Sequence, residues 1–286
     1  MTSVPDKPDV VERLGKSRIQ HGPANQRVYL MKLDRGDLPG LPEELIAFAR
    51  TRGYGKIFAV VPADTTPAFA AANYLREAEI PGYFRGKIAA DLLAFYLDEH
   101  RARRDETDAK AILDLARRKA LDAPAPPALP ESWTLRPARP DDAPAMAELY
   151  RVVFETYPFP IHDPAYLRRT MDENILYYGI WNGEQLVALS SAETRPQALS
   201  VEMTDFATAP AARGASLARH LLARMDEDLA AKGFCTAYTI ARAASAGMNI
   251  CFARGGYTWG GTLWNNTQIC GKLEHMNVWH KALNAS

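Results

Sequence analysis

The clearest chemical pattern in this sequence lies at residues 202–222, which read EMTDFATAPAARGASLARHLL. An apolar strand ends there at Pro210, a turn of small residues follows, and an amphipathic helix begins near Ser216. At such a turn the first N–H groups of the helix are unpaired, the helix dipole is positive, and small side chains let an anion approach the backbone. Because Arg213 adds a charged donor, we predict that this turn binds a pyrophosphate.

The elements around this turn alternate in a mixed α/β pattern, with Asn182-Gly183 as a hairpin signal between two apolar runs. The pattern predicts seven strands, at Thr134–Ala138, Leu176–Trp181, Gln185–Glu193, Val201–Thr208, Thr236–Ala241, Thr258–Ile269 and Met276–His280. It predicts four helices, at Asp142–Glu155, Pro164–Glu173, Ser216–Ala231 and Ala246–Arg254.

The N-terminal part predicts a second α/β unit. Its strands are expected at Ser17–Gln20, Arg27–Leu33, Lys56–Val61 and near Tyr83, and its helices at Glu43–Thr51 and Ala68–Arg76. A further helix, Asp98–Lys119, carries charges of both signs and is expected to be a mostly solvated spacer.

The order helix, strand, helix, strand within Glu43–Phe84 recurs within Leu221–Trp259. This echo indicates either a duplication or only the commonness of α/β units. Since the N-terminal part lacks a glycine-rich turn like the one at Arg213, we expect it to be non-catalytic or to support the substrate.

Length and composition favour two domains. The 286 residues exceed the usual domain of roughly 100 to 200 residues. Four prolines within Ala123–Pro130 predict an extended linker. We therefore expect an N-terminal α/β domain at 1–122, a linker at 123–131 and a second domain at 132–286.

Charge and cysteine usage exclude several partners. The 34 basic and 34 acidic residues cancel, so no field attracts nucleic acid or an anionic membrane. Cys235, Cys251 and Cys270 share no CxxC spacing, and the histidines are scattered, which argues against disulfides and a metal site. Because the sequence shows no apolar run of ~18 residues and no signal peptide, we expect a soluble, cytoplasmic protein. Its partner is expected to be a small molecule, and the sequence leaves the oligomeric state open.

The segment Arg213-Gly214-Ala215-Ser216-Leu217-Ala218 resembles the Q/R-x-x-G-x-G/A coenzyme A loop of the GNAT acetyltransferase superfamily. Ser216 stands where a glycine is usual, and we expect it to adopt ordinary backbone angles and offer its hydroxyl to a phosphate. The resemblance implies that these six residues bind acetyl-CoA. It also implies a mixed, mostly antiparallel sheet flanked by helices at 132–286, with the N-terminal domain as a degenerate copy under the duplication alternative.

The resemblance also suggests which groups act on the acetyl group. Backbone N–H groups of Phe206, Ala207 and Thr208 would lie beside the cofactor and polarise the acetyl carbonyl. The resemblance also places Phe252 at the cofactor, where many GNAT enzymes have a tyrosine that protonates the thiolate; phenylalanine has no proton to give. Tyr238 or Tyr257 could replace it, although each also fits a packing role, and the acid is left unassigned.

The position of Glu202 resembles that of the general-base glutamate in several GNAT enzymes. The alternative is that Glu202 is only a glutamate on an exposed strand face. A lysine-type amine has a pKa near 10.4, so its deprotonation at pH 7 costs about 4.6 kcal/mol and a positioned base is useful. In a regular strand Asp205 faces the other side from Glu202. We therefore expect Asp205 to contact a loop or a substrate amine.

Five further residues are candidates for binding the acceptor. Tyr157, His162 and Asp163 follow the first helix, where GNAT enzymes build the acceptor wall; the alternative is a stiff loop with Asp163 as a helix cap. Arg242 and Asn249 follow the strand Thr236–Ala241 and could hold a carboxylate, with a surface salt bridge as the alternative for Arg242.

Beyond the superfamily, nearly the whole chain resembles the β-lysine Nε-acetyltransferases, through SRIQHG, ETYPFPIHDP, VEMTDFAT, GMNICFARGGY and MNVWHKAL. The resemblance implies acetyl transfer from acetyl-CoA to the terminal amine of β-lysine, which gives a neutral compatible solute, with a lysine aminomutase as the metabolic partner. The alternatives are a GNAT enzyme for another small diamine or amino acid and a non-catalytic acyl-CoA-binding protein.

Overall fold

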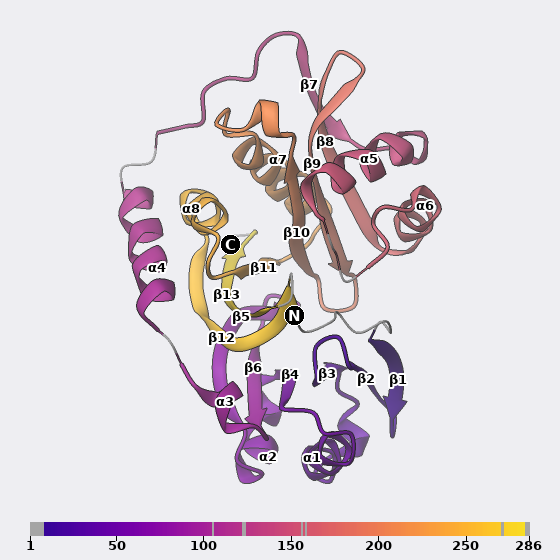
Figure 1. The fold of residues 1–286 in the computed structure, drawn as a ribbon, viewed down its shortest axis with the longest axis vertical. Helices are drawn as coiled ribbons and strands as arrows, with labels where there is room; N and C mark the ends of the chain where they lie inside the picture. Colours follow the sequence, from indigo (N-terminus) through magenta and orange to yellow (C-terminus); the bar gives the residue numbers. More distant parts are fainter. Residues whose placement is uncertain are drawn as a thin grey trace.

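The computed structural model describes residues 9–104, 106–121, 124–155, 157, 159–269 and 272–283. Within these residues, thirteen strands form one sheet in the order β1-β2-β3-β4-β6-β5-β12-β13-β11-β10-β9-β8-β7 (Figure 1). The expected mixed sheet with flanking helices is therefore confirmed, and strands from both parts of the chain belong to it. The division into domains at 1–122 and 132–286 stays a prediction.

The N-terminal half, residues 9–96, contributes six strands and two α-helices. The strands are β1 (Val10–Leu14), β2 (Ser17–Gly22), β3 (Arg27–Lys32), β4 (Lys56–Pro62), β5 (Leu75–Phe84) and β6 (Ile88–Tyr96). The helices are α1 (Leu41–Thr51) and α2 (Thr66–Ala71), and apolar residues of α1 pack with β3 and β4 in a core of their own.

The C-terminal half contributes seven strands and four helices. The strands are β7 (Trp133–Pro137), β8 (Ile175–Asn182), β9 (Gln185–Arg195), β10 (Ser200–Thr208), β11 (Thr236–Arg242), β12 (Thr258–Ile269) and β13 (Lys272–Ala282). The helices are α5 (Ala143–Val153), α6 (Pro164–Glu173), α7 (Leu217–Ala231) and α8 (Ala246–Arg254). Helices α7 and α8 pack on one face of this half, and α5 and α6 pack with other strand residues in a separate core.

The two halves repeat one topology. The order β1-β2-β3-β4-β6-β5 matches β8-β9-β10-β11-β13-β12, and each series contains one parallel pair at the same place, β3 with β4 and β10 with β11. Helices α1 and α7 follow the first strand of those pairs, and α2 and α8 follow the second. This match favours duplication over chance.

The loop between β3 and α1 differs from its counterpart between β10 and α7. Its Asp37 accepts hydrogen bonds from the backbone N–H groups of Lys16 and Ser17 and from the Ser17 hydroxyl. The counterpart loop, residues 209–216, contains no acidic residue. The expectation that the N-terminal copy is not a second active site stays a prediction.

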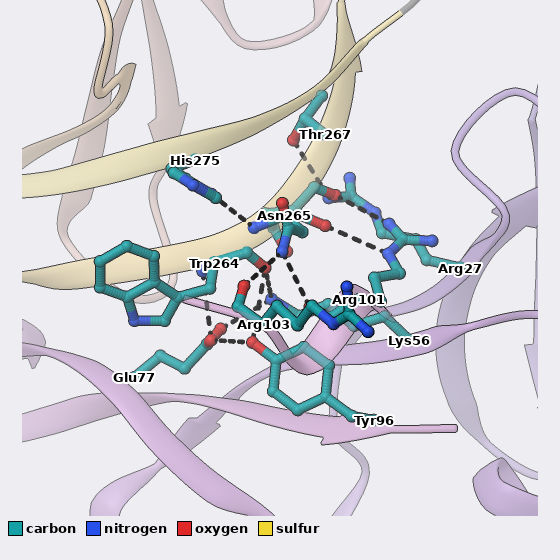
Figure 2. Close-up of polar contacts among 11 residues, drawn as sticks. Arg27, Lys56, Glu77, Tyr96, Arg101, Arg103, Trp264, Asn265, Thr267 and His275 are labelled. Atoms are coloured by element: carbon teal, nitrogen blue, oxygen red, sulfur yellow. Dashed lines mark hydrogen bonds and ion pairs between the residues drawn. The ribbon is translucent and has the colours of Figure 1, made fainter. Parts of the chain in front are cut away.

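The halves join where β5 meets β12. Gly261 pairs with Ala78, and a Cβ at Gly261 would lie 2.2 Å from the carbonyl oxygen of Glu77, so only glycine fits. Figure 2 shows the polar cluster behind this joint. Lys56 donates to Glu77 and to the carbonyl of Trp264, each at 2.7 Å, and both charged side chains are fully buried. Burial lowers the pKa of Lys56 to about 8, against the opposing effect of Glu77.

Several expected elements differ from the observed ones. The predicted helix Ala68–Arg76 ends at Ala71, and its last two residues begin β5. Strands β1 and β6 were not predicted. The predicted helix Asp98–Lys119 is two helices, α3 (Glu99–Ala102) and α4 (Glu106–Leu121).

Helix α4 is also not a mostly solvated spacer. It lies alongside α8 (Figure 1), and its Leu113 and Ala116 are buried in the core of the C-terminal half. These two residues are three apart and share one face of the helix, and this spacing outweighs the charge on the rest of the helix. Residues 124–130 of the expected linker contain no helix or strand, and Ala123 lies outside the described residues.

Candidate functional site

Strands β10 and β11 separate partway along their length. Only residues 200–202 of β10 pair with β11, whereas residues 203, 204, 207 and 208 pair with β9 alone. Strand β11 continues to Arg242 paired with β13. Because alternate peptide groups of a strand point to its two sides, part of the backbone at Phe206, Ala207 and Thr208 has no strand partner on the β11 side.

The turn after β10 exposes a row of backbone N–H groups. Within the described part of the chain, the N–H groups of residues 214–218 have no hydrogen-bond acceptor. Gly214 has a φ of +88°, and a Cβ there would meet nothing within 4 Å. Arg213 is exposed beside them. The turn therefore has the free donors, the open backbone and the cation that a pyrophosphate requires.

Ser216 corrects one expectation. It caps α7 with φ +56° and ψ +24°, the left-handed conformation that glycine favours, and not with ordinary strand or helix angles. The next residue, Leu217, is buried in the core and anchors the helix start, so the bend must occur at Ser216. Serine therefore takes up the geometry of the usual glycine at the expense of some backbone strain.

The other predicted cofactor residues lie around the same place. Phe206 packs edge to face against Phe252, which is 1% exposed in the core beside α7. Ala207 is buried on the α5 side, while Thr208, Ala215 and Ala218 keep some exposure.

Asp205 lies on the same face of the sheet as Glu202, contrary to expectation. The pairing of β10 with β9 shifts between Thr204 and Ala207, and Asp205 in this bulge has a φ of +54°. Its carboxylate accepts hydrogen bonds from the hydroxyls of Ser191, at 2.6 Å, and Tyr157. The extra residue of a bulge reverses the alternation of side chains, so two of the predicted acceptor residues, Asp205 and Tyr157, meet here.

A third carboxylate completes an acidic cluster, which we define as Glu193, Glu202 and Asp205. Glu193 on β9 lies directly opposite Glu202 on β10, and Ser191, two residues before it on the same face, holds Asp205. All three side chains are partly exposed.

Burial raises the pKa of each member of the acidic cluster. For Glu193, burial together with the charges of Glu202 and Asp205 raises the pKa to about 8. For Glu202, burial outweighs the opposing effects of Arg195 and Tyr238. For Asp205, burial outweighs its hydrogen bonds. Three acids so close together favour a bound cation, and a carboxyl with a raised pKa suits general-base chemistry near neutral pH.

Arg195, the last residue of β9, and Tyr238 on β11 border the acidic cluster. The Tyr238 hydroxyl donates to Glu202 at 3.1 Å and accepts from Nε of Arg195 at 3.0 Å. The Tyr238 ring contacts Tyr83 of the N-terminal half, with 5.3 Å between ring centroids. Burial raises the pKa of Tyr238 well above its usual value, so it stays protonated. The N-terminal half therefore forms part of this site.

The remaining predicted residues lie elsewhere. The Tyr257 hydroxyl donates to the buried Asp226 at 2.7 Å, which removes it as a candidate acid. Asp163 is exposed and caps α6 through the Ala165 N–H, the alternative given for it, and His162 beside it is half-buried.

Neither predicted carboxylate-binding residue fits that role. Asn249 is fully buried; its amide donates to carbonyls of the β11–α8 loop and its oxygen accepts from Asn277 and Trp279, so no group is left for a substrate. Arg242 forms a 2.8 Å salt bridge with Glu274 on β13, which was its alternative.

Sequence reasoning missed Glu193, Arg195 and Tyr150. The first two continue an alternation from Ser191 along one face of β9, and polar residues at every second position of a buried strand were the available signal. Tyr150 of α5 is fully buried, and its hydroxyl has no partner among the described residues. Burial and the charge of Asp205 raise its pKa well above the usual value.

Two absences apply to the described part of the chain. It contains no group of three or more histidine, cysteine or acidic residues arranged to hold a metal ion. None of its helices combines the length and hydropathy needed to cross a membrane.

Comparison with known proteins gives consistent matches. The acetyltransferase (GNAT) family model matches residues 143–253. The chain is 33% identical to a β-lysine N(6)-acetyltransferase of Methanococcus maripaludis over 268 residues, which cover 94% of this chain and 97% of that protein. It is 32% identical to N-acetyltransferase YodP of Bacillus subtilis, over 93% of this chain and 95% of the relative.

A third relative, a β-lysine N(6)-acetyltransferase of Methanosarcina mazei, is 40% identical over 155 residues, which cover 54% of this chain and 57% of the relative. The first two alignments extend well beyond the family match and include the N-terminal half.

Proposed function

Because the chain belongs to the GNAT acetyltransferase family, we propose that it transfers the acetyl group of acetyl-CoA to the terminal amine of β-lysine. The product is Nε-acetyl-β-lysine, a neutral compatible solute. In this role a lysine aminomutase supplies the substrate, and both enzymes work in the cytoplasm. The names of two relatives support the choice of acceptor.

One observation carries the proposal: the acidic cluster lies beside the unpaired stretch of β10. Glu202 is the last β10 residue that pairs with β11, and Asp205 occupies the bulge immediately before Phe206. An ammonium group attracted by these carboxylates is held next to the backbone that lines the acetyl position. The site thus suits a cationic amine acceptor.

The chain's own residues divide the work as follows. Backbone N–H groups of residues 214–218 and Arg213 hold the pyrophosphate of acetyl-CoA, which supplies the acetyl group as a thioester. An N–H group at residues 206–208 donates to the acetyl carbonyl. Glu202 removes a proton from the amine, directly or through water, while the Tyr238 hydroxyl fixes its carboxylate.

The direct test is thiol release from acetyl-CoA by the purified chain. We expect release that requires β-lysine and matches the amount of acetylated product found by mass spectrometry. Binding of acetyl-CoA without release on addition of β-lysine or other amines would overturn the proposal in favour of a non-catalytic acyl-CoA-binding protein. Release with another diamine and none with β-lysine would retain the acetyltransferase and reject the acceptor.

A further inference from the structure

We propose that Arg195 binds the carboxylate of the acceptor and that Glu193 binds its second amine, so that only the far amine reaches the acetyl group. This inference rests on the proposed function and adds the residues that select the acceptor.

The Arg195 guanidinium is largely unpaired. Of its five N–H donors, only the one on Nε makes a hydrogen bond within the described residues, to the Tyr238 hydroxyl. Its Nη2 lies 4.0 Å from the Glu202 carboxylate, and 31% of the side chain is exposed. The two terminal nitrogens therefore remain available for the bidentate bond that guanidinium forms with a carboxylate.

Tyrosines from both halves border this cation. The Tyr238 hydroxyl accepts from Nε of Arg195, and the Tyr83 ring contacts the Tyr238 ring with 5.3 Å between centroids. Tyr83 comes from β5 of the N-terminal half. The pairing of the two halves thus gives this end of the site its polar wall.

The charges follow the strand in one order. Arg195 is at the β9–β10 turn, the pair Glu193 and Glu202 comes next, and Asp205 lies beyond it beside the unpaired part of β10. Arg195 and Ser191, which holds Asp205, are four residues apart, or about 14 Å along the strand. The Arg195 side chain covers part of this span, because its Nη2 lies 4.0 Å from the Glu202 carboxylate. From the pair Glu193 and Glu202 to Ser191 the distance is about 7 Å along the strand.

An extended β-lysine molecule fits this order. Its carboxylate and terminal nitrogen are six bonds apart, about 7 to 8 Å, with the second amine between them. With the carboxylate on Arg195, the second amine lies at Glu193 and the terminal amine at Glu202 and Asp205. Ordinary lysine has the same length, but its second amine is attached one carbon closer to the carboxylate and is therefore shifted away from Glu193.

The test compares acceptors that each lack one group. The first is the diamine with a methyl group in place of the carboxymethyl group of β-lysine, and the second is the straight-chain ω-amino acid of the same length without the second amine. Arg195→Gln should lower kcat/KM for β-lysine by about 10- to 100-fold and leave kcat/KM for the diamine within about threefold. Glu193→Gln should reduce the preference for β-lysine over the ω-amino acid by about tenfold or more.

A purely structural role for Arg195, through Tyr238 and Glu202, would lower β-lysine and diamine turnover equally, and that result would overturn the inference. Arg242→Gln is the matched comparison, because Arg242 lies at the other end of β11 and is already paired with Glu274. A loss of β-lysine preference in Arg242→Gln, with none in Arg195→Gln, would assign the carboxylate to Arg242. Failure of the wild-type protein to acetylate β-lysine would instead refute the proposed function, which separates the two failures.

Discussion

Replacement of Glu202 by glutamine tests the catalytic base. Glutamine has the same shape and can still accept the Tyr238 hydrogen bond, but it cannot take up a proton. Glu193 and Asp205 remain and can still hold the ammonium form of the acceptor, because a bound cation lowers the pKa of a neighbouring carboxyl and favours its ionised form. The variant must therefore rely on the small fraction of amine that is already neutral.

The expected loss follows from that fraction. An amine with a pKa of about 10.4 is neutral in roughly one molecule of 2,500 at pH 7 and one in 25 at pH 9. The rate of the chemical step in Glu202→Gln should therefore fall by about 10² to 10⁴ at pH 7, which corresponds to about 3 to 5 kcal/mol in the barrier. The deficit should shrink by about tenfold per pH unit as pH rises.

Single-turnover thiol release, measured from pH 6 to pH 10 with saturating acetyl-CoA, reports the chemical step. The wild-type rate should fall at low pH, because Glu202 must be ionised to act and burial raises its pKa. Glu274→Gln, which removes a carboxylate paired with Arg242, is the matched control and should keep the wild-type profile. A wild-type rate in Glu202→Gln at pH 7, or a deficit independent of pH, would refute the assignment.

Three further predictions test the rest of the structure. Gly214→Asp should weaken acetyl-CoA binding in calorimetry by at least tenfold. Gly233→Asp at the other end of α7 should not weaken it, although φ there is +86° and a Cβ also meets nothing within 4 Å. Equal losses in both variants would make backbone strain the cause. Lys56→Met should lower the free energy of unfolding in urea by about 3 to 5 kcal/mol, because it leaves the buried Glu77 carboxylate without its cation. The double variant Lys56→Met, Glu77→Leu should recover part of this lost stability, and no recovery would contradict the ion-pair account. In the folded state the pKa of Glu193 is raised from 4.5 to about 8, so the stability that its protonated form contributes is present below about pH 4.5 and is lost as pH rises through about 8. The unfolding free energy of the wild type relative to Glu193→Gln should therefore fall over that range. A difference that stays constant with pH would contradict the raised pKa.

Local patterns predicted most of the elements of the C-terminal half. The amphipathic stripe of α7, the Asn182-Gly183 hairpin and the alternation in β10 each depend on residues close in sequence. Strand β6 was missed because its residues, IAADLLAFY, are buried by pairing on both sides and lack an alternating pattern. The continuous sheet depends on the contact of Gly261 with Ala78, which no local pattern encodes.

The site was predicted in part. The turn at residues 213–218 has unpaired N–H groups, and Asp205 contacts the loop residue Tyr157, but the bulge at Asp205 places two carboxylates on one face where the sequence predicted opposite faces. Such a bulge depends on the partner strand and not on the residues of β10 alone. Asn249 illustrates the opposite case, because its partners Asn277 and Trp279 are remote in sequence and only the fold brings them together.

The most direct test of the central claim compares acceptors and locates the new acetyl group. Initial rates with β-lysine, ordinary lysine and cadaverine at saturating acetyl-CoA give kcat/KM for each, and fragment masses of the product identify the modified nitrogen. We expect β-lysine to exceed both competitors by about 5-fold to over 100-fold, since each competitor leaves a charged group of the site unmatched, and we expect acetylation on the terminal amine alone. Equal or faster turnover of cadaverine, or acetylation of the amine nearer the carboxylate, would contradict the account.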